Sequence, residues 1–172
     1  PAIASILGHR GRWLAAQNPD WGYAVPLDVS TEEACTALWQ TGTAAERSQV
    51  LHYWRDRRPE RARQLVEQTW LQDKAPDRAI FLATFAQGLS DADEPLLETA
   101  LDDKSKQVRA AAAQLLAGLS GSQLVDRTIA RLQPCVRVES NTLGIAPPCR
   151  LAEDAIRDGL NPQPPSGIGE KA

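Results

Sequence analysis

The chain has 172 residues, a length that suits one domain with or without an appendage and can bury roughly 70% of its unfolded surface without a metal or disulfide. Its 22 acidic and 19 basic residues give a net charge of −3, which excludes a general attraction to nucleic acid or anionic membrane. Three cysteines are too few for a secreted disulfide framework, and no apolar run approaches the ~18 residues of a membrane span, so we expect a cytoplasmic protein.

Residues 1–42 are predicted to form an N-terminal helical cap with an aromatic connector. An apolar pattern over residues 2–17 indicates a short helix, although glycines weaken its middle. The connector over residues 18–26 carries a tryptophan and a tyrosine, which we expect to pack onto the neighbouring helices. Residues 30–33 read Ser-Thr-Glu-Glu, a capping box that predicts a helix to about Trp39.

Residues 43–133 are predicted to hold three helix pairs. The first pair opens with a second capping box over residues 43–46, Thr-Ala-Ala-Glu, and its first helix runs to about Arg57. Pro59 begins the partner helix, because proline is favoured at the first helical position. An apolar stripe then continues to Trp70 and predicts the buried face of that helix.

The second pair is predicted to begin at Pro76. Residues 79–86 are apolar nearly all round, which predicts a helix covered on more than one side. Gly88 ends this helix, and an acidic run over residues 91–94 caps its partner. The inner face of the partner is expected to carry Leu97.

The third pair begins with a helix whose apolar positions run from Val108 to Leu119, and we expect Leu116 to be buried in it. Glycines at 118 and 121 end this helix. The predicted inner face of its partner helix consists of Leu124, Val125, Thr128, Ile129 and Leu132.

Residues 134–172 form a predicted irregular C-terminal segment. Alternating β-formers over residues 136–145 are compatible with a short two-stranded hairpin. Residues 151–158 predict one or two helical turns ended by Gly159, and residues 162–172 are expected to be extended or mobile. Because the chain has no methionine and its end lacks a helix cap, we expect a piece of a longer protein, although removal of an initiator explains the start equally well.

A sequence period of 31 residues joins the helix pairs, since Arg47, Arg78 and Arg109 share one register. Apolar pairs recur at the same offset after the first two arginines. A period in this range is typical of stacked repeats, in which a single helix pair cannot bury its apolar face alone. The expected fold is therefore all-α, an α-α superhelix of about three helix pairs.

The stretch over residues 101–112, with its Asp-Asp turn and Val-Arg pair, resembles the HEAT repeat. This resemblance implies that Asp102 or Asp103 bridges adjacent units together with Arg109. The wider chain, including residues 10–14 and the Arg-Asp-Gly end at residues 157–159, looks like an uncharacterised bacterial family built on such repeats. HEAT-like proteins usually serve as binding scaffolds, which gives an expectation by analogy of fold.

Residues that could perform catalysis are scattered along the chain. His9 and His52 are the two histidines, and Cys35 could act as a nucleophile beside one of them, but a buried thiol fits its helical surroundings better. Cys135 and Cys149 lack the two further ligands that a zinc site needs. The paired acids fit helix starts, and the chain has no glycine-rich phosphate loop. We therefore expect no catalytic residue, no metal site and no cofactor.

An arginine cluster over residues 55–63 is the clearest functional candidate, with five arginines and two acids at the turn between two helices. It predicts a non-catalytic scaffold that binds a protein partner, for which an acidic surface is the natural complement. The predicted contact residues are Arg55, Arg57, Arg58 and Arg61.

Two alternatives stay open. The first is a nucleic-acid-binding module that uses the same arginines, which is disfavoured because the corresponding turn over residues 88–94 is acidic. The second is an enzyme with its site where the repeats meet residues 134–161. The sequence does not indicate an oligomeric state.

Overall fold

The computed structural model describes the following residues: Arg10, Trp13, Val29, 31–139, 142–146 and 150–160. The helix predicted over residues 2–17 lies outside this set apart from Arg10 and Trp13, which are helical. The aromatic connector over residues 18–26 and the tail over residues 162–172 also lie outside it.

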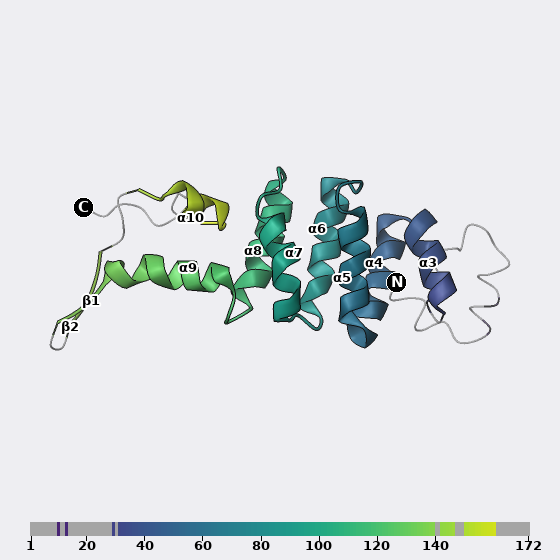
Figure 1. The fold of residues 1–172 in the computed structure, drawn as a ribbon, viewed down its shortest axis with the longest axis horizontal. Helices are drawn as coiled ribbons and strands as arrows, with labels where there is room; N and C mark the ends of the chain where they lie inside the picture. The colour runs from purple at the N-terminus through teal and green to yellow at the C-terminus, as the bar shows by residue number, and fades with distance from the viewer. Residues whose placement is uncertain are drawn as a thin grey trace. The chain divides into compact units, whose positions relative to one another are not determined.

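Within the described residues the chain forms eight α-helices and one two-stranded sheet, so the prediction of a mostly helical protein is confirmed (Figure 1). The chain divides into two compact units, residues 1–50 and residues 51–172. None of the described helices combines the length and the apolar character that crossing a membrane would need.

The first unit contains helix α3, Glu32–Thr41, and the start of α4, Ala44–Arg57. Thr31 caps α3, because its hydroxyl accepts a hydrogen bond from the backbone N–H of Ala34 at 3.1 Å. The cap therefore lies one residue later than the first position of the predicted box.

The predicted capping box at the start of α4 is confirmed. The backbone N–H of Thr43 donates to the Glu46 carboxylate at 2.7 Å, and the Glu46 N–H donates back to the Thr43 hydroxyl at 3.4 Å. These bonds lower the pKa of Glu46, with the backbone bond from Thr43 as the largest cause.

The second unit continues α4 and adds α5, Pro59–Thr69, and α6, Ala75–Ala83. Pro59 opens α5 as predicted. A single turn of 3-10 helix, η2 (Thr84–Ala86), follows α6, and Gly88 then takes a φ of +64°, a left-handed conformation that favours glycine.

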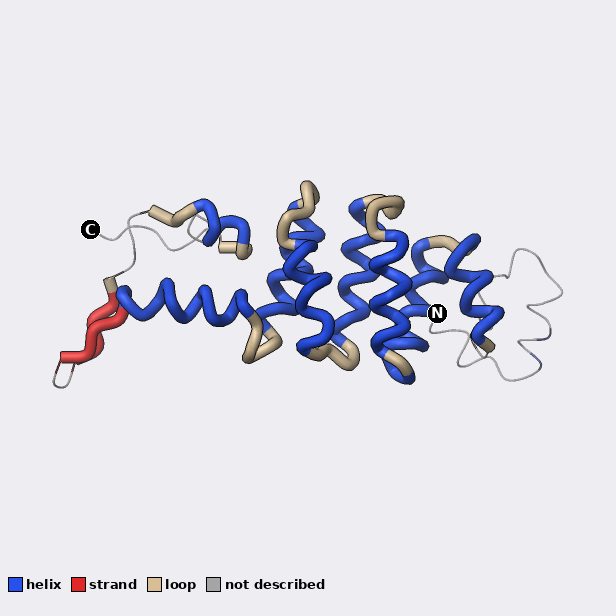
Figure 2. The backbone as a smooth tube through the Cα atoms, in the orientation of Figure 1, coloured by secondary structure: helices blue, strands red, loops and turns tan. Residues whose placement is uncertain are grey.

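A second 3-10 turn, η3 (Asp91–Asp93), leads into α7, Glu94–Ala100, and α8, Lys106–Ala117, follows. Helix α8 packs against both α6 and α7, and Figure 2 shows these helices beside one another. Their contact surfaces bury the predicted inner residues, which include Phe81, Leu82, Phe85, Leu97, Val108 and Leu116.

Helix α9, Gln123–Leu132, leads through a 3-10 turn, η4 (Gln133–Cys135), into the predicted hairpin (Figure 2). Strand β1, Val136–Glu139, pairs antiparallel with β2, Thr142–Ile145, so the hairpin is confirmed. The last described helix is α10, Glu153–Arg157, which ends before Gly159 with a φ of +95°.

Two predicted apolar faces are only partly covered. Ile80 on α6 is 44% exposed, so this helix is not buried on all sides. On α9 the predicted inner face is buried at Leu124 alone, while Ile129 and Leu132 are about half exposed. An apolar stripe therefore identified the face of each helix but not whether a neighbour covers it.

The 31-residue register of the sequence reappears in two stacking contacts. The guanidinium carbon of Arg47 lies 4.1 Å from the ring centroid of Trp39 in the first unit. In the second unit the guanidinium carbon of Arg78 lies 5.4 Å from the ring centroid of Trp70. Each pair joins the end of one helix pair to the start of the next, which gives the repeated positions a shared structural role.

Candidate functional site

The first of the predicted contact arginines lies in the interior. Arg55, near the end of α4, is 1% exposed, and both of its terminal nitrogens donate to the Asp93 carboxylate at 2.9 and 2.8 Å. The same guanidinium donates to the carbonyls of Gln87 at 2.9 Å and Gly88 at 2.7 Å, and lies 4.4 Å from the Phe85 ring centroid. Arg55 cannot touch a partner from this position, which corrects the expectation that it is a contact residue.

Asp93 has two arginine partners, because Arg63 also donates to it at 2.9 Å. Burial raises the pKa of the Asp93 carboxyl, but the hydrogen bonds and charge of Arg55, followed by the bond from Arg63, outweigh burial and hold the pKa below its ordinary value. Asp93 also accepts from the backbone N–H of Ser90 at 3.1 Å. The carboxylate therefore belongs to a structural ion-pair cluster rather than to a helix cap alone.

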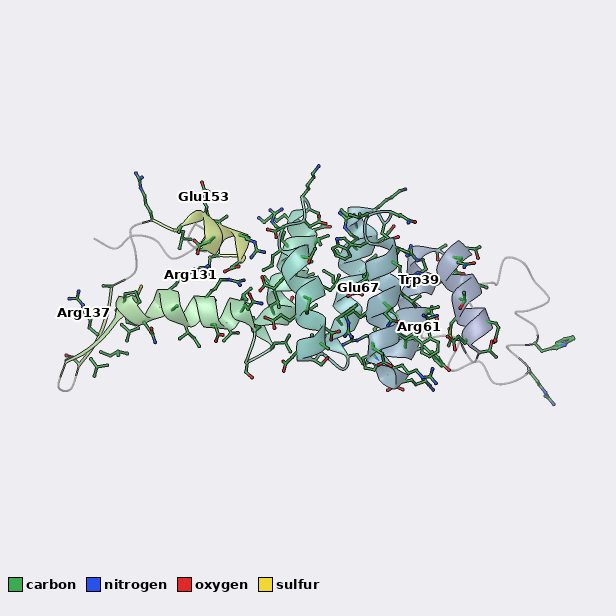
Figure 3. The ribbon with its side chains drawn as sticks, in the orientation of Figure 1. Trp39, Arg61, Glu67, Arg131, Arg137 and Glu153 are labelled. Atoms are coloured by element: carbon green, nitrogen blue, oxygen red, sulfur yellow. The ribbon has the colours of Figure 1, made fainter. Side chains whose placement is uncertain are left out.

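The remaining predicted contact residues, Arg57, Arg58 and Arg61, surround the turn between α4 and α5. Arg57 and Arg58 are exposed and Arg61 is half-buried at the start of α5, where Figure 3 labels it. The Arg57 guanidinium carbon lies 4.1 Å from the ring centroid of Tyr53, and its Nη1 pairs with Asp56 at 3.4 Å. We call these three residues the arginine turn.

The buried ion pair lies directly beneath the arginine turn along the chain. Arg55 ties the last turn of α4 to the carbonyl of Gly88 and to Asp93 at the same time. A side chain fixed in this way limits the movement of the adjacent backbone, so the arginine turn keeps one shape before any partner arrives.

The bridge expected between Arg109 and the Asp102–Asp103 pair does not form through the carboxylates. The Asp103 carboxylate pairs with Arg78 at 2.8 Å, while Asp102 accepts from Arg157 at 2.7 and 2.9 Å. Arg109 donates instead to the backbone carbonyls of Asp103 at 2.7 Å and Lys104 at 3.0 Å. The arginine one register earlier therefore makes the acidic bridge.

A second ion-pair network attaches α10 to α7 and α9. Arg127 on α9 donates to Asp158 at 2.9 Å through two nitrogens and to Glu98 on α7 at 2.9 Å. Arg131, which lies between α9 and α10 in Figure 3, pairs with Asp158 at 2.7 Å. Burial raises the pKa of the Asp158 carboxyl, but the bonds from the two arginines outweigh burial and lower the pKa overall.

The residues considered for catalysis remain apart among the described residues. His52 contacts Gln87 at 3.2 Å, and Cys35 is buried with its thiol 3.5 Å from the carbonyl of Val29. His9 and Cys149 lie outside the described residues. No group of three or more potential metal ligands occurs in the part of the chain that the structure describes.

The junction of α9, the hairpin and α10 holds a pocket of about 460 Å³, at the place considered for an enzyme site. Its walls are mostly apolar and include the buried Cys135 thiol, which donates to the carbonyl of Arg131 at 3.3 Å. The charged side chains around it are Arg131, Arg150 and Asp154. None of its described lining residues is a histidine, and a base that could activate the thiol does not line the pocket.

The hairpin presents an apolar face to solvent. Val136 pairs with Ile145 and Val138 with Leu143, so these four side chains share one face, and each is between 43% and 77% exposed. Fully covering a side chain of this size is worth about 1.5–3 kcal/mol. Four such residues form a surface smaller than a stable protein interface usually requires.

Sequence reasoning did not identify Asp93, Glu98 or Asp158 as the acidic centres of these networks. Their partners lie between 29 and 38 residues away, in Arg55, Arg127 and their neighbours. The shared register of Arg78 and Arg109 was the one available signal, since it marks arginines with a repeated structural task.

Comparison with protein families matches residues 1–172 to DUF5691, which is described as a family of unknown function. No curated protein and no solved structure matches the chain. The similarity thus extends over the arginine turn, both ion-pair networks and the hairpin, but it carries no statement about activity or partner.

Proposed function

We propose that this chain, which belongs to the DUF5691 family, is a non-catalytic scaffold of stacked, HEAT-like helix pairs that binds an acidic protein partner in the cytoplasm. The proposed contact residues are Arg57, Arg58 and Arg61. The observation that carries the proposal is the position of this arginine turn above the buried Arg55–Asp93 pair. Arg55 leaves the contact set because it is enclosed.

The charge and shape of the turn support an acidic partner. Arg57 and Arg58 are adjacent and exposed, and the stacking of Arg57 on Tyr53 orients a guanidinium toward solvent. Guanidinium groups bind carboxylates in a two-point geometry that lysine cannot provide. A turn that is already ordered loses little conformational entropy when the partner binds.

The test captures partners from cell extract on the immobilised chain and identifies them by mass spectrometry. The double variant Arg57→Gln/Arg58→Gln should lose a partner that the wild-type chain retains, and the loss should be mimicked by raising the salt concentration. Arg137→Gln, which removes an exposed arginine from the hairpin, is the matched control and should retain the partner. Equal retention by the double variant and the wild type would refute the arginine turn as a contact surface.

The same preparation separates the nucleic-acid alternative. Retention of a labelled oligonucleotide at low salt, abolished by Arg57→Glu/Arg58→Glu, would replace the acidic protein with nucleic acid as the ligand. We expect no retention, because the described turn that follows α6 carries Asp91 and Asp93 rather than further basic residues.

A further inference from the structure

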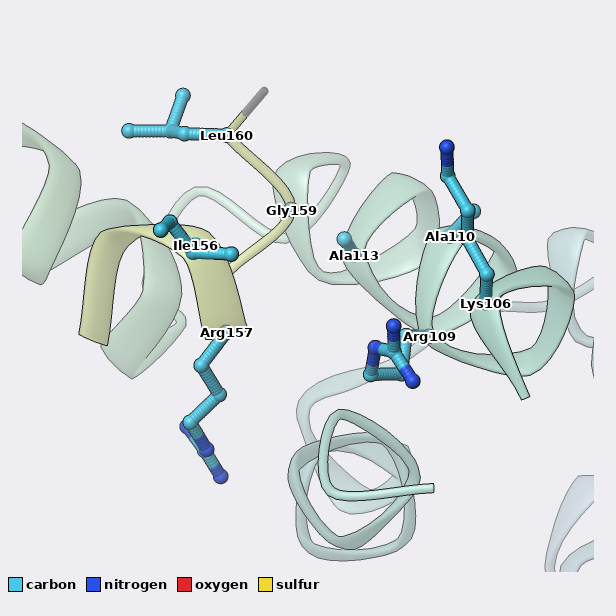
Figure 4. A pocket seen from close by; sticks show the side chains of 8 residues that line it. All are labelled: Lys106, Arg109, Ala110, Ala113, Ile156, Arg157, Gly159 and Leu160. Carbon is cyan, nitrogen blue, oxygen red and sulfur yellow. The ribbon is translucent and has the colours of Figure 1, made fainter. Parts of the chain in front are cut away.

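A pocket of about 340 Å³ lies between α8 and α10, and Figure 4 shows the side chains around it. Three cationic side chains line this pocket: Lys106 and Arg109 from α8, and Arg157 from α10. Its remaining described walls are small or apolar and carry no acidic side chain. We call this the α8–α10 pocket.

Small residues let α10 approach α8 closely at the base of the pocket. A Cβ atom added to Gly159, which has a φ of +95°, would lie 3.1 Å from the Cβ of Ala113. A larger residue at either position would push the two elements apart or fill the space between them. The pocket therefore depends on a specific close contact in the fold.

Arg109 and Arg78 occupy equivalent positions, 31 residues apart, and part of their bonding is the same. Arg78 donates through Nη1 to the carbonyl of Asp73 at 2.5 Å, and Arg109 donates through Nη1 to the carbonyl of Lys104 at 3.0 Å. Asp73 and Lys104 are themselves 31 residues apart. The backbone half of the interaction is thus repeated in both units.

The carboxylate half of the interaction is missing at the second position. Arg78 Nη2 pairs with the Asp103 carboxylate at 2.8 Å. Among the described residues Arg109 has no acidic partner, because the residue 31 positions after Asp103 is Pro134, which carries no charge. Arg109 instead borders the α8–α10 pocket with part of its guanidinium unused.

The other charges around the pocket strengthen its positive character. Lys106 is exposed and makes no hydrogen bond or ion pair with any residue that the structure describes. It occupies the first turn of α8, which has no acidic residue and no side-chain cap, so the positive end of the helix dipole adds to its charge. Arg157 is already neutralised by Asp102 and Glu98, and therefore acts as a wall more than as a free charge.

We propose that the α8–α10 pocket binds a carboxylate side chain of an acidic protein segment, held by Arg109 and Lys106. The ligand takes the place that the Asp103 carboxylate occupies against Arg78 one register earlier. The pocket is large enough to admit a whole aspartate or glutamate side chain. This inference rests on the proposed function, because it names a second contact point for an acidic protein.

The experiment titrates an acetylated, amidated tetraglutamate peptide into the ¹⁵N-labelled full chain and follows backbone amide shifts at low salt. The amides of Ala110, Ala113 and Gly159 report on the pocket, whereas those of Tyr53 and Arg58 report on the arginine turn. We expect the pocket amides to titrate with the peptide and a tetraglutamine peptide to leave them unmoved. Lys106→Gln should weaken binding at the pocket amides at least about fivefold, since a lost charge-assisted contact is worth about 1–3 kcal/mol.

The variants keep the outcomes separate. Lys106→Gln removes no described bond, and Arg109→Gln tests the central residue, although it also removes two bonds to the preceding loop. Arg57→Gln/Arg58→Gln should leave the pocket amides unaffected. Absence of pocket shifts in the wild type, or equal weakening by Arg137→Gln, would overturn the pocket proposal while the arginine turn stands on its own amides.

Inorganic phosphate provides a further arm of the same titration. Phosphate that moves the pocket amides while tetraglutamate does not would overturn the assignment to a protein carboxylate. Tetraglutamate shifts that phosphate reverses would support it, because both anions then compete for Arg109 and Lys106.

Discussion

Arg55 and Asp93 form a two-point ion pair, at 2.9 and 2.8 Å, with both side chains fully buried. The pair joins the end of α4 to the turn that precedes α7, 38 residues later. A carboxylate removed from water is costly unless hydrogen bonds satisfy it, and here Arg55, Arg63 and the N–H of Ser90 all bind Asp93. The pair specifies where the α4–α5 turn lies against its neighbour.

The first prediction concerns removal of one member of this pair. Arg55→Leu should lower the free energy of unfolding by about 3–5 kcal/mol, because it leaves the Asp93 charge buried with fewer partners. Urea denaturation followed by circular dichroism measures the change. Arg57→Gln, on the exposed side of the same turn, should leave the denaturation midpoint nearly unchanged. A midpoint for Arg55→Leu equal to that of Arg57→Gln would show that the buried pair contributes little.

The second prediction is a loss of stability in acid. The folded pKa of Asp93 lies below the pKa of about 3.9 expected when the chain is unfolded. The unfolded chain therefore binds more protons between the two values, so the stabilisation is present above about pH 4 and disappears as the pH falls through the folded pKa. Asp102 and Asp158 have lowered pKa values and act in the same direction.

Urea midpoints at pH 7, 5, 4 and 3 measure this dependence. Asp93→Asn should be less stable at pH 7 and should lose less further stability between pH 5 and pH 3, since it has removed one of the titrating groups. Parallel curves for Asp93→Asn and the wild type would mean that other carboxylates account for the acid response.

Local sequence signals predicted most of the helix boundaries. The capping box of Thr43 and Glu46 and the proline at position 59 each start a helix where expected, because both act through bonds or angles within a few residues. The hairpin was also within reach of the sequence, since alternation of β-formers on either side of Asn141 is a short-range pattern.

The candidate site was less accessible to sequence reasoning. Five arginines in one cluster look alike in composition, and the partner that draws Arg55 inward lies 38 residues away in a run that resembles a helix cap. Arginine is rarely buried unless it is paired, so the identity of the buried one depends on the folded neighbour. The position of Arg109 beside a pocket likewise depends on α10, which no periodic pattern connects to α8.

The third prediction tests the core between α6, α7 and α8. Leu116 is fully buried on α8, so Leu116→Ala should cost about 2–5 kcal/mol in the free energy of unfolding. Leu71 is 94% exposed just after α5, and Leu71→Ala should change the same free energy by less than about 0.5 kcal/mol. Thermal or urea denaturation measures both. A cost below about 1 kcal/mol at Leu116 would mean that α8 has been assigned the wrong inner face.

The fourth prediction concerns α10, a helix of five residues, Glu153–Arg157, in which Ala155 alone is buried. A helix this short does not persist by itself in water, so its order must come from its attachments. Those attachments are largely ionic: Arg127 and Arg131 hold Asp158, and Arg157 holds Asp102. Arg127→Gln should therefore loosen α10 while α6 to α8 stay intact.

Amide hydrogen exchange of the wild type and Arg127→Gln measures this loosening. Loss of the Arg127 bonds to Asp158 and Glu98 should raise exchange in α10 roughly 5–30-fold, the equivalent of about 1–2 kcal/mol for partly exposed charged bonds. Added salt should accelerate α10 exchange in the wild type, because it screens the same charges. Arg137→Gln, which leaves the network untouched, should exchange like the wild type. Unchanged protection of α10 in Arg127→Gln and in high salt would show that apolar contacts such as Ala155, rather than the arginines, hold it in place.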